Sequence, residues 1–338
     1  MNDFQEQKET KNLFTEIIQG YSSFVFNFQN YSQVLHLKHF TIINQAEIDR
    51  LWDKYFQEAK SQNLPTFDYQ LEYIKKQSLW TDQDESEIDK IQDLIKRLRS
   101  TISILFIPSQ ITQYKEQIEI QEQKLMVLLT RKYTVIGYTA ESYANKKIQE
   151  LNMVRSIYED KELNKLKCNK NNDANDTNDI EDNLEIHYNE IISKFNDKNL
   201  KKAAIFPLAQ NFYSMCDEDA YKFYGKAIVD LTNYQQELFS YLRYFNHILS
   251  KSPPEIILKH NDPEKLELWY KGNTKLKEQM DKHEKGDSFT PNMTAEDKEI
   301  LGIKDRGKRD EVAELLKQKS GQGDLRMEDL LKAKGEIK

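Results

Sequence analysis

The sequence is poor in residues that interrupt secondary structure, with only 10 Gly and 7 Pro among 338 residues. This scarcity predicts long elements joined by few tight turns. Cysteine is scarcer still. Cys168 and Cys216 are the two cysteines of the chain, which excludes a framework of several disulfides and favours a reducing compartment.

The sequence also lacks the features of membrane, secreted and strongly basic proteins. Apolar runs such as 104–107 are far shorter than the roughly 20 residues that span a bilayer. The N-terminus has no basic segment followed by an apolar one, so we expect neither a secretion signal nor a transmembrane segment. The net charge of −7 disfavours a protein dedicated to nucleic acid, which usually carries a basic stripe.

What the sequence does contain is material for an aromatic core and for long solvated helices. Hydrophobic residues make up 38% of the chain, and it has 18 Tyr and 16 Phe. Charged residues make up 31%, which is typical of amphipathic helices with one face in water. We therefore predict a mainly α-helical protein.

The clearest helix is predicted to begin near Thr232 and to end before Pro253 and Pro254. Thr232 with Gln235 three residues later fits a capping box at its start. Proline stops the helix because it lacks the amide hydrogen and clashes with the preceding turn. Its apolar face comprises Tyr234, Leu238, Tyr241, Leu242, Phe245, Ile248 and Leu249. We expect this helix to lie at the centre of the helical body.

A long helical hairpin is predicted over residues 84–132, with its turn at Pro108. Ser109 is the expected N-cap of the second helix. Ile111, Ile118 and Leu125 recur every seven residues, which indicates a coiled-coil seam between the two helices. The hairpin could pack onto the body or project from it.

Two segments predict other structure. Phe24, Phe26 and Phe28 alternate with less bulky residues, which favours a short strand pair over 21–40, although a buried helix fits the same residues. Segment 169–183 consists almost wholly of Asn and Asp with Lys, Ala and Thr, and predicts a disordered loop.

We divide the chain into an N-terminal helical region, 1–108, a central helical body, 109–250, and a charged helical tail with linkers, 251–338.

The candidate sites for a metal ion or a phosphate lack the required residues at the required spacing. In the Asn/Asp segment, Asn178 and Leu184 stand where a calcium-binding loop requires Gly and Glu. His36 and His39 have no third ligand at suitable spacing. Gly225-Lys226 lacks the upstream glycine of a phosphate-binding loop. We therefore predict no catalytic residue, no metal and no cofactor.

Local basic spots leave a nucleic-acid function open as the first alternative. They are Arg97 with Arg99, Arg131-Lys132 and Lys146-Lys147. Acidic neighbours make a solvated helical surface the better interpretation. An enzyme with an unrecognised site is the second alternative.

Two clusters of apolar residues are the predicted partner-binding sites. Tyr221, Phe223 and Tyr224 could form an exposed patch, although such a cluster more often lies in a core. In the tail, Met327, Leu330 and Leu331 share one small apolar face without an evident local partner. A homo-oligomer is compatible with both.

Three stretches carry a family resemblance. Residues 136–144 read IGYTAESYA, residues 223–235 contain FYGK and LTNYQ, and residues 261–270 read NDPEKLELWY. Together they resemble helical proteins from the tail-module genes of tailed bacteriophages, over roughly residues 64–270, with the Asn/Asp segment as a departure. The resemblance implies a non-enzymatic structural or assembly-chaperone role, phage tail proteins as partners, and a place in the host cytoplasm or the virion. It carries over no site residues.

Overall fold

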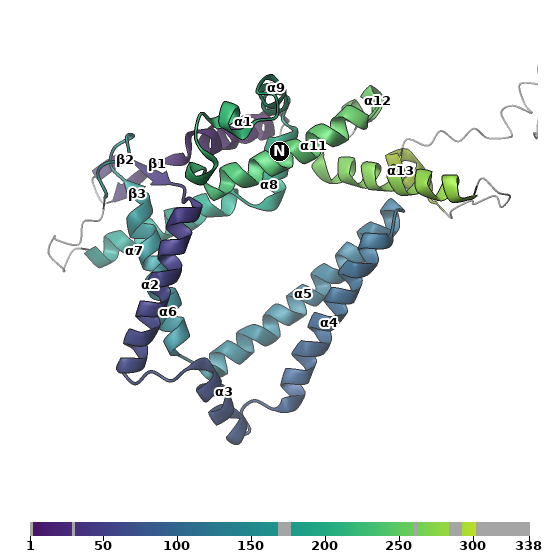
Figure 1. Cartoon of the computed structure of the whole chain (residues 1–338). Helices are drawn as coiled ribbons and strands as arrows, with labels where there is room; N and C mark the ends of the chain where they lie inside the picture. The colour runs from purple at the N-terminus through teal and green to yellow at the C-terminus, as the bar shows by residue number, and fades with distance from the viewer. Residues whose placement is uncertain (1–2, 29–30, 168–176, 260–261, 284–292, 302–338) are drawn as a thin grey trace, which may run out of the picture. The chain divides into compact units, whose positions relative to one another are not determined.

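The computed structural model describes residues 3–28, 31–167, 177–259, 262–283 and 293–301 (Figure 1). Helices predominate among these residues, so the predicted mainly α fold is confirmed. Contacts divide the chain into two units. Unit 1 comprises 1–100 and 116–266, and unit 2 comprises 101–115 and 267–338. The helical hairpin passes through both units, because the border crosses each of its helices.

Unit 1 contains a small antiparallel sheet with the strand order β1-β2-β3. β1 (Tyr21–Phe28) pairs with β2 (Tyr31–Lys38), which confirms the predicted N-terminal strand pair. β3 (Ile157–Tyr158) was not predicted, because two residues carry no periodic signal. Phe26 and Leu35 from the sheet form a core cluster with Met153, Ile157 and Leu184.

The helix predicted as central is α11 (Asn233–Lys251). Its capping box forms as expected, with Thr232 and Gln235 bonded to each other's backbone amides. The Gln235 amide nitrogen also donates to the carbonyl oxygens of Ile17 and Ile18, at 2.9 Å and 3.0 Å. It thereby bonds carbonyls at the end of α1 (Asp3–Gln19), of which that of Ile17 also accepts from the Gly20 amide at 3.1 Å.

Among the remaining helices of unit 1, two run side by side. α2 (Ile42–Ser61) lies along α6 (Ala140–Ser156), as Figure 1 shows, and the Trp52 indole donates to the Asn145 amide oxygen at 2.7 Å. The other helical segments are α3 (Phe67–Lys76), α7 (Thr177–Lys194), α8 (Asp197–Ile205), α9 (Pro207–Met215), α10 (Ala220–Tyr224), the 3-10 turn η1 (Ile228–Asp230) and α12 (Pro254–Lys259).

Pro207 begins a new helix after α8, because it occupies the first turn of α9, where no amide hydrogen is needed. The segment 169–183 predicted as a disordered loop is partly helical, since α7 begins at Thr177. Residues 168–176 lie outside the described residues.

The hairpin consists of α4 (Asp82–Ile104) and α5 (Pro108–Ile136). The predicted turn is confirmed, but the predicted cap is not. Pro108 is the first residue of α5, so Ser109 lies inside the first turn rather than at the N-cap. Proline fits this position because its fixed φ angle suits a helix start.

Unit 2 joins the hairpin turn to two tail helices, α13 (Pro263–His283) and α14 (Ala295–Leu301). The Asp297 carboxylate, which is fully buried, accepts hydrogen bonds from the Ser109 amide and hydroxyl. The Lys275 ammonium donates to the carbonyl oxygens of Ser103 and Leu105. The tail therefore satisfies the last carbonyls of α4 and the first amides of α5.

Candidate functional site: a protein contact surface on the hairpin

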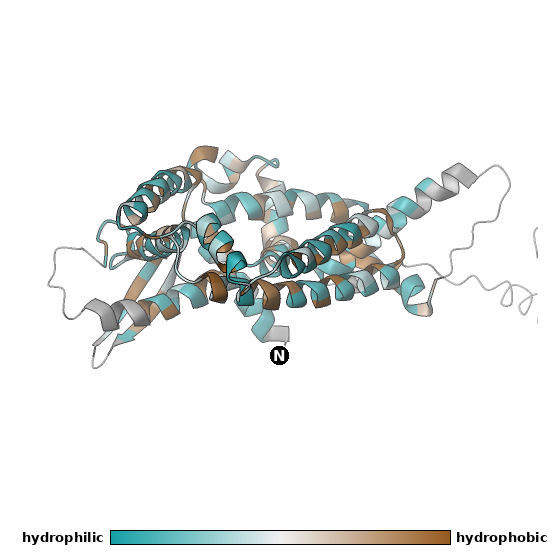
Figure 2. Ribbon diagram, turned by 90° about the horizontal axis from the view of Figure 1, so that it is seen from below, coloured by the Kyte–Doolittle hydropathy of each residue, from teal (hydrophilic) through white to brown (hydrophobic). Residues whose placement is uncertain are grey.

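The hairpin has a regular apolar seam. Ile88 and Ile95 of α4 are buried, and so are Ile111 and Ile118 of α5. Each pair is seven residues apart in the sequence, which keeps its members on one side of a helix. Figure 2 shows how apolar and polar residues alternate along these helices. The predicted heptad pattern thus marks the inward side of the hairpin.

The outward side of α5 carries large apolar side chains as well. Ile120 is 51% exposed, Met126 71%, Val127 69% and Tyr133 57%. We call these four residues the outer patch of α5. From Leu125 to Leu129 the helix is apolar around its whole circumference, a composition that normally belongs to a helix covered on all sides. In α5 the inward side is covered by the rest of the hairpin, whereas the outward side is exposed.

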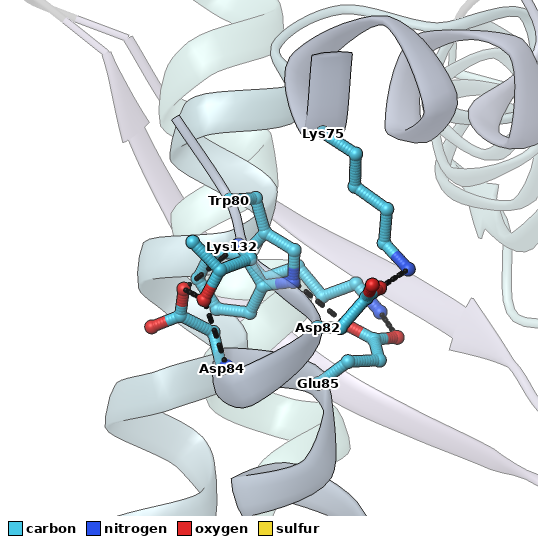
Figure 3. Close-up of polar contacts among 7 residues, drawn as sticks. Lys75, Trp80, Asp82, Asp84, Glu85 and Lys132 are labelled. Carbon is cyan, nitrogen blue, oxygen red and sulfur yellow. Dashed lines mark hydrogen bonds and ion pairs between the residues drawn. The ribbon is translucent and has the colours of Figure 1, made fainter. Parts of the chain in front are cut away.

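The base of the hairpin is fixed by a charged pair and an indole (Figure 3). Trp80 is fully buried, and its indole nitrogen donates to Glu85 Oε2 at 2.7 Å. The Lys132 ammonium donates to Glu85 Oε1 at 2.5 Å. Burial raises the pKa of Glu85, but the hydrogen bonds from Lys132 and Trp80 outweigh it, so the pKa lies below its ordinary value. The carboxylate is therefore held in its charged form between α4 and α5.

A second layer of contacts surrounds this base. Asp84 caps α4 by accepting from the Thr81 amide and hydroxyl, at 2.9 Å and 2.6 Å. The Arg131 guanidinium lies 5.7 Å from the centre of the Trp80 ring and 3.7 Å from Asp84. Lys75 of α3 pairs with Asp82 at 2.8 Å (Figure 3). These contacts fix the start of α4 against both α3 and α5, so the outer patch lies on a firmly attached helix.

Most of the basic spots on the hairpin and on α6 are already paired with carboxylates. Arg99 lies 2.6 Å from Glu122, and Lys147 lies 2.8 Å from Glu150. Arg131 and Lys132 take part in the base of the hairpin. Cations that are held this way are poorly placed to neutralise phosphates, which disfavours the nucleic-acid alternative.

The residues predicted to bind partners take different positions. Tyr221 is 62% exposed, whereas Phe223 is buried against Phe212 and Phe239. The Tyr224 hydroxyl donates to the Gln235 carbonyl oxygen at 2.8 Å, and burial raises the pKa of Tyr224 far above its ordinary value. Phe223 and Tyr224 therefore take the core position weighed as their alternative, and Tyr221 alone faces solvent. Met327, Leu330 and Leu331 lie outside the described residues.

Sequence reasoning missed the outer patch of α5 and a second exposed apolar row on α9. That row comprises Leu208, Phe212 and Met215, exposed by 51%, 39% and 81%. The signal was present in both places, as apolar residues seven apart outside the seam on α5 and at the i, i+4, i+7 spacing on α9. Both patterns resemble those of core positions, so sequence alone does not separate them.

One constellation in unit 1 resembles a nucleophilic site in composition. Glu16, Ser22 and His39 form a chain, with Ser22 Oγ 2.6 Å from Glu16 Oε2 and 3.0 Å from His39 Nε2. The serine donates its only proton to Glu16, so His39 Nε2–H is the donor to Ser22. Glu16 borders a cavity of about 400 Å³, but Ser22 and His39 are both buried and neither lines it. A serine that donates its proton to Glu16 rather than to its histidine, and that is shielded from solvent, does not serve as a nucleophile.

The two histidines considered as metal ligands take separate partners. His36 Nδ1 lies 2.9 Å from the Ser23 hydroxyl, while the His39 ring packs edge-on against Phe195 and Tyr234, which stack on each other. Within the described ranges, no three His, Cys, Asp or Glu side chains are grouped to hold a metal ion. Over the same residues, no helix is both long enough and apolar enough to cross a membrane.

Comparison of the chain with protein-family models, curated proteins and solved structures finds no match.

Proposed function

We propose that the protein is a non-enzymatic assembly protein that binds other proteins through the outer patch of α5. The observation that carries this proposal is the combination of an apolar helical surface with a rigid base. Ile120, Met126, Val127 and Tyr133 present large exposed side chains. Surfaces of this kind on a rigid helix are typical of sites that receive a partner helix.

The base of the hairpin supports the same function. Trp80, Glu85 and Lys132 join α4 and α5 through side-chain contacts rather than a flexible connection. A fixed helix loses little conformational freedom when a partner binds, so more of the contact energy appears as affinity. The hairpin is thus suited to hold a partner in one orientation, as an assembly factor must.

The setting in which we place this activity is the assembly of a phage tail. It derives from the resemblance of segments 136–144, 223–235 and 261–270 to helical proteins of tail modules. In this setting the partners are other tail proteins, and the protein acts in the host cytoplasm or in the virion.

A photo-cross-linking amino acid at Val127 tests this function in infected host cells. The matched control carries the same amino acid at Asp89, an exposed position on the polar side of α4. Mass spectrometry then identifies the captured proteins. We expect tail components to be captured from Val127 and not from Asp89.

Equal or absent capture at both positions would contradict the use of this surface. Capture of tail-unrelated proteins from Val127 would keep the contact surface and remove the phage-tail setting.

A further inference from the structure

The charges beside the outer patch are arranged unevenly along α5. Glu116 lies one turn before Ile120, whereas Lys124 and Arg131 lie one turn after Ile120 and Val127 respectively. The exposed apolar row formed by Ile120 and Val127 therefore has Glu116 at one end, Arg131 at the other end and Lys124 between its two apolar residues. Glu116 and Lys124 are exposed and make no ion pair with any part of the chain that the structure describes.

We propose that the partner of this row is a second copy of the same chain, with the two α5 helices antiparallel. The inference rests on the proposed function, because it names an occupant of the same surface. A twofold axis that passes midway between Gln123 and Lys124 places Ile120 opposite the partner's Val127. The same axis places Glu116 opposite the partner's Arg131, so the apolar and the charged contacts require one register.

A twofold axis makes this contact self-complementary, since each pair of residues occurs twice. A parallel pair can also have a twofold axis, but it sets Glu116 against Glu116 and Arg131 against Arg131. Like charges at close range are unfavourable, so the charge pattern selects the antiparallel pair. Arg131 already lies 3.7 Å from Asp84, but its side chain is 60% exposed, so the partner's Glu116 would share the guanidinium with Asp84.

The size of the surface predicts a weak dimer. Two crossing helices bury less than the roughly 1,200–2,000 Å² of a typical stable interface. We therefore expect a dissociation constant in the micromolar range, so that the protein is a monomer at low concentration and a dimer at about 100 µM. Salt should weaken the dimer, because the charged pairs lie at the solvent-exposed rim of the contact.

Sedimentation velocity of the full chain over a concentration series tests the proposal. Val127→Asp should weaken dimerisation by about tenfold or more, since it sets two carboxylates in the apolar row. Met215→Asp is the matched control, because Met215 is an exposed apolar residue of α9, away from the hairpin. Thermal denaturation of both variants checks that each remains folded.

A charge exchange tests the antiparallel register. Glu116→Lys should weaken the dimer, and the double variant Glu116→Lys/Arg131→Glu should restore it by exchanging the two ends. In a protein with Cys168→Ser and Cys216→Ala, Gln123→Cys should form a disulfide dimer, because residues beside a twofold axis meet their own copies. Gln113→Cys, near the N-terminal end of α5, should not form a disulfide dimer.

A monomer at every concentration, or equal effects of Val127→Asp and Met215→Asp, would overturn the proposal. Failure of the charge exchange to restore the dimer would overturn the antiparallel register. The proposed function is judged separately, because the weak dimer leaves monomers at low concentration in which Val127 is free to contact tail proteins, and their capture does not require self-association.

Discussion

The Asp297 carboxylate accepts hydrogen bonds from the Ser109 amide at 2.6 Å and from the Ser109 hydroxyl at 2.8 Å, across 188 residues of sequence. It also accepts from the Thr294 amide and hydroxyl, at 2.9 Å and 2.8 Å. A single buried side chain therefore caps two helices, α5 and α14. Burial raises the pKa of Asp297, but the hydrogen bonds from Thr294 and Ser109 lower it below its ordinary value, so the carboxylate remains charged.

Replacement of this carboxylate should loosen unit 2 without unfolding unit 1. Asp297→Ala leaves the amides of Ser109 and Thr294 without their acceptor, which we expect to cost about 1–3 kcal/mol. Hydrogen exchange should rise in 108–113 and in 294–301, and remain unchanged in α11. The control is Glu296→Gln, at an exposed neighbouring position. Unchanged exchange at both segments would contradict the double cap.

Gly272 of α13 provides the space for α14. A Cβ atom at this position would lie 2.2 Å from Leu301 Cδ2 and 3.1 Å from the Phe106 carbonyl oxygen. Gly272→Ala should therefore displace Leu301 and destabilise unit 2 by about 1–3 kcal/mol, as overpacking usually does. Hydrogen exchange in 295–301 measures the effect.

A double variant identifies the clash as the cause. Leu301→Ala alone loses a buried side chain, but in the Gly272→Ala background it also removes the atom that clashes. We expect the double variant Gly272→Ala/Leu301→Ala to lose less stability than the sum of the single losses. Additive losses would show that the two residues act independently.

The charged pair at the hairpin base should behave as a coupled unit. Lys132→Met removes the stronger partner of the Glu85 carboxylate and leaves a half-buried charge with Trp80 alone, at a cost of roughly 2–4 kcal/mol. Glu85→Gln leaves the buried ammonium of Lys132 without its carboxylate. The double variant Glu85→Gln/Lys132→Met should be more stable than the sum of the two losses predicts. Urea denaturation measures all three values, and the absence of coupling would contradict the prediction.

Acid should weaken the fold through His39 first. Burial lowers the pKa of His39 from 6.5 to about 4. Between these values the unfolded chain binds a proton that the folded chain excludes, so the free energy of unfolding falls as the pH drops through this range. The full loss is roughly 3 kcal/mol, since each pKa unit corresponds to about 1.4 kcal/mol.

Urea denaturation at about pH 7 and about pH 5 measures the first part of this loss, about 2 kcal/mol, in the window that His39 dominates, above the range in which carboxylates titrate. His39→Gln keeps a polar group beside Ser22 but has no titrating ring. Its stability should therefore change less between the two pH values than that of the original protein, even where the variant is less stable throughout. Equal pH dependence in both proteins would rule out His39 as the source.

Local sequence patterns predicted much of the fold. The capping box of Thr232 and Gln235 and the strand alternation around Phe26 depend on neighbours within a few residues, and both form. The seven-residue spacing of Ile111 and Ile118 likewise identified the inner side of α5. These features are set by backbone geometry and by the periodicity of one helix or strand.

Only the tertiary structure decided which apolar residues remain uncovered and which distant groups meet. Tyr221 and Phe223 stand two residues apart in one aromatic cluster, yet one is exposed and the other is buried. Ser109 was predicted as a cap, but its partner Asp297 could not be foreseen. Periodicity shows that a face is apolar, whereas the element that covers it depends on packing between segments far apart in the chain. For this reason the sequence determined the helices and their inner faces, and the structure alone exposed the outer patch of α5.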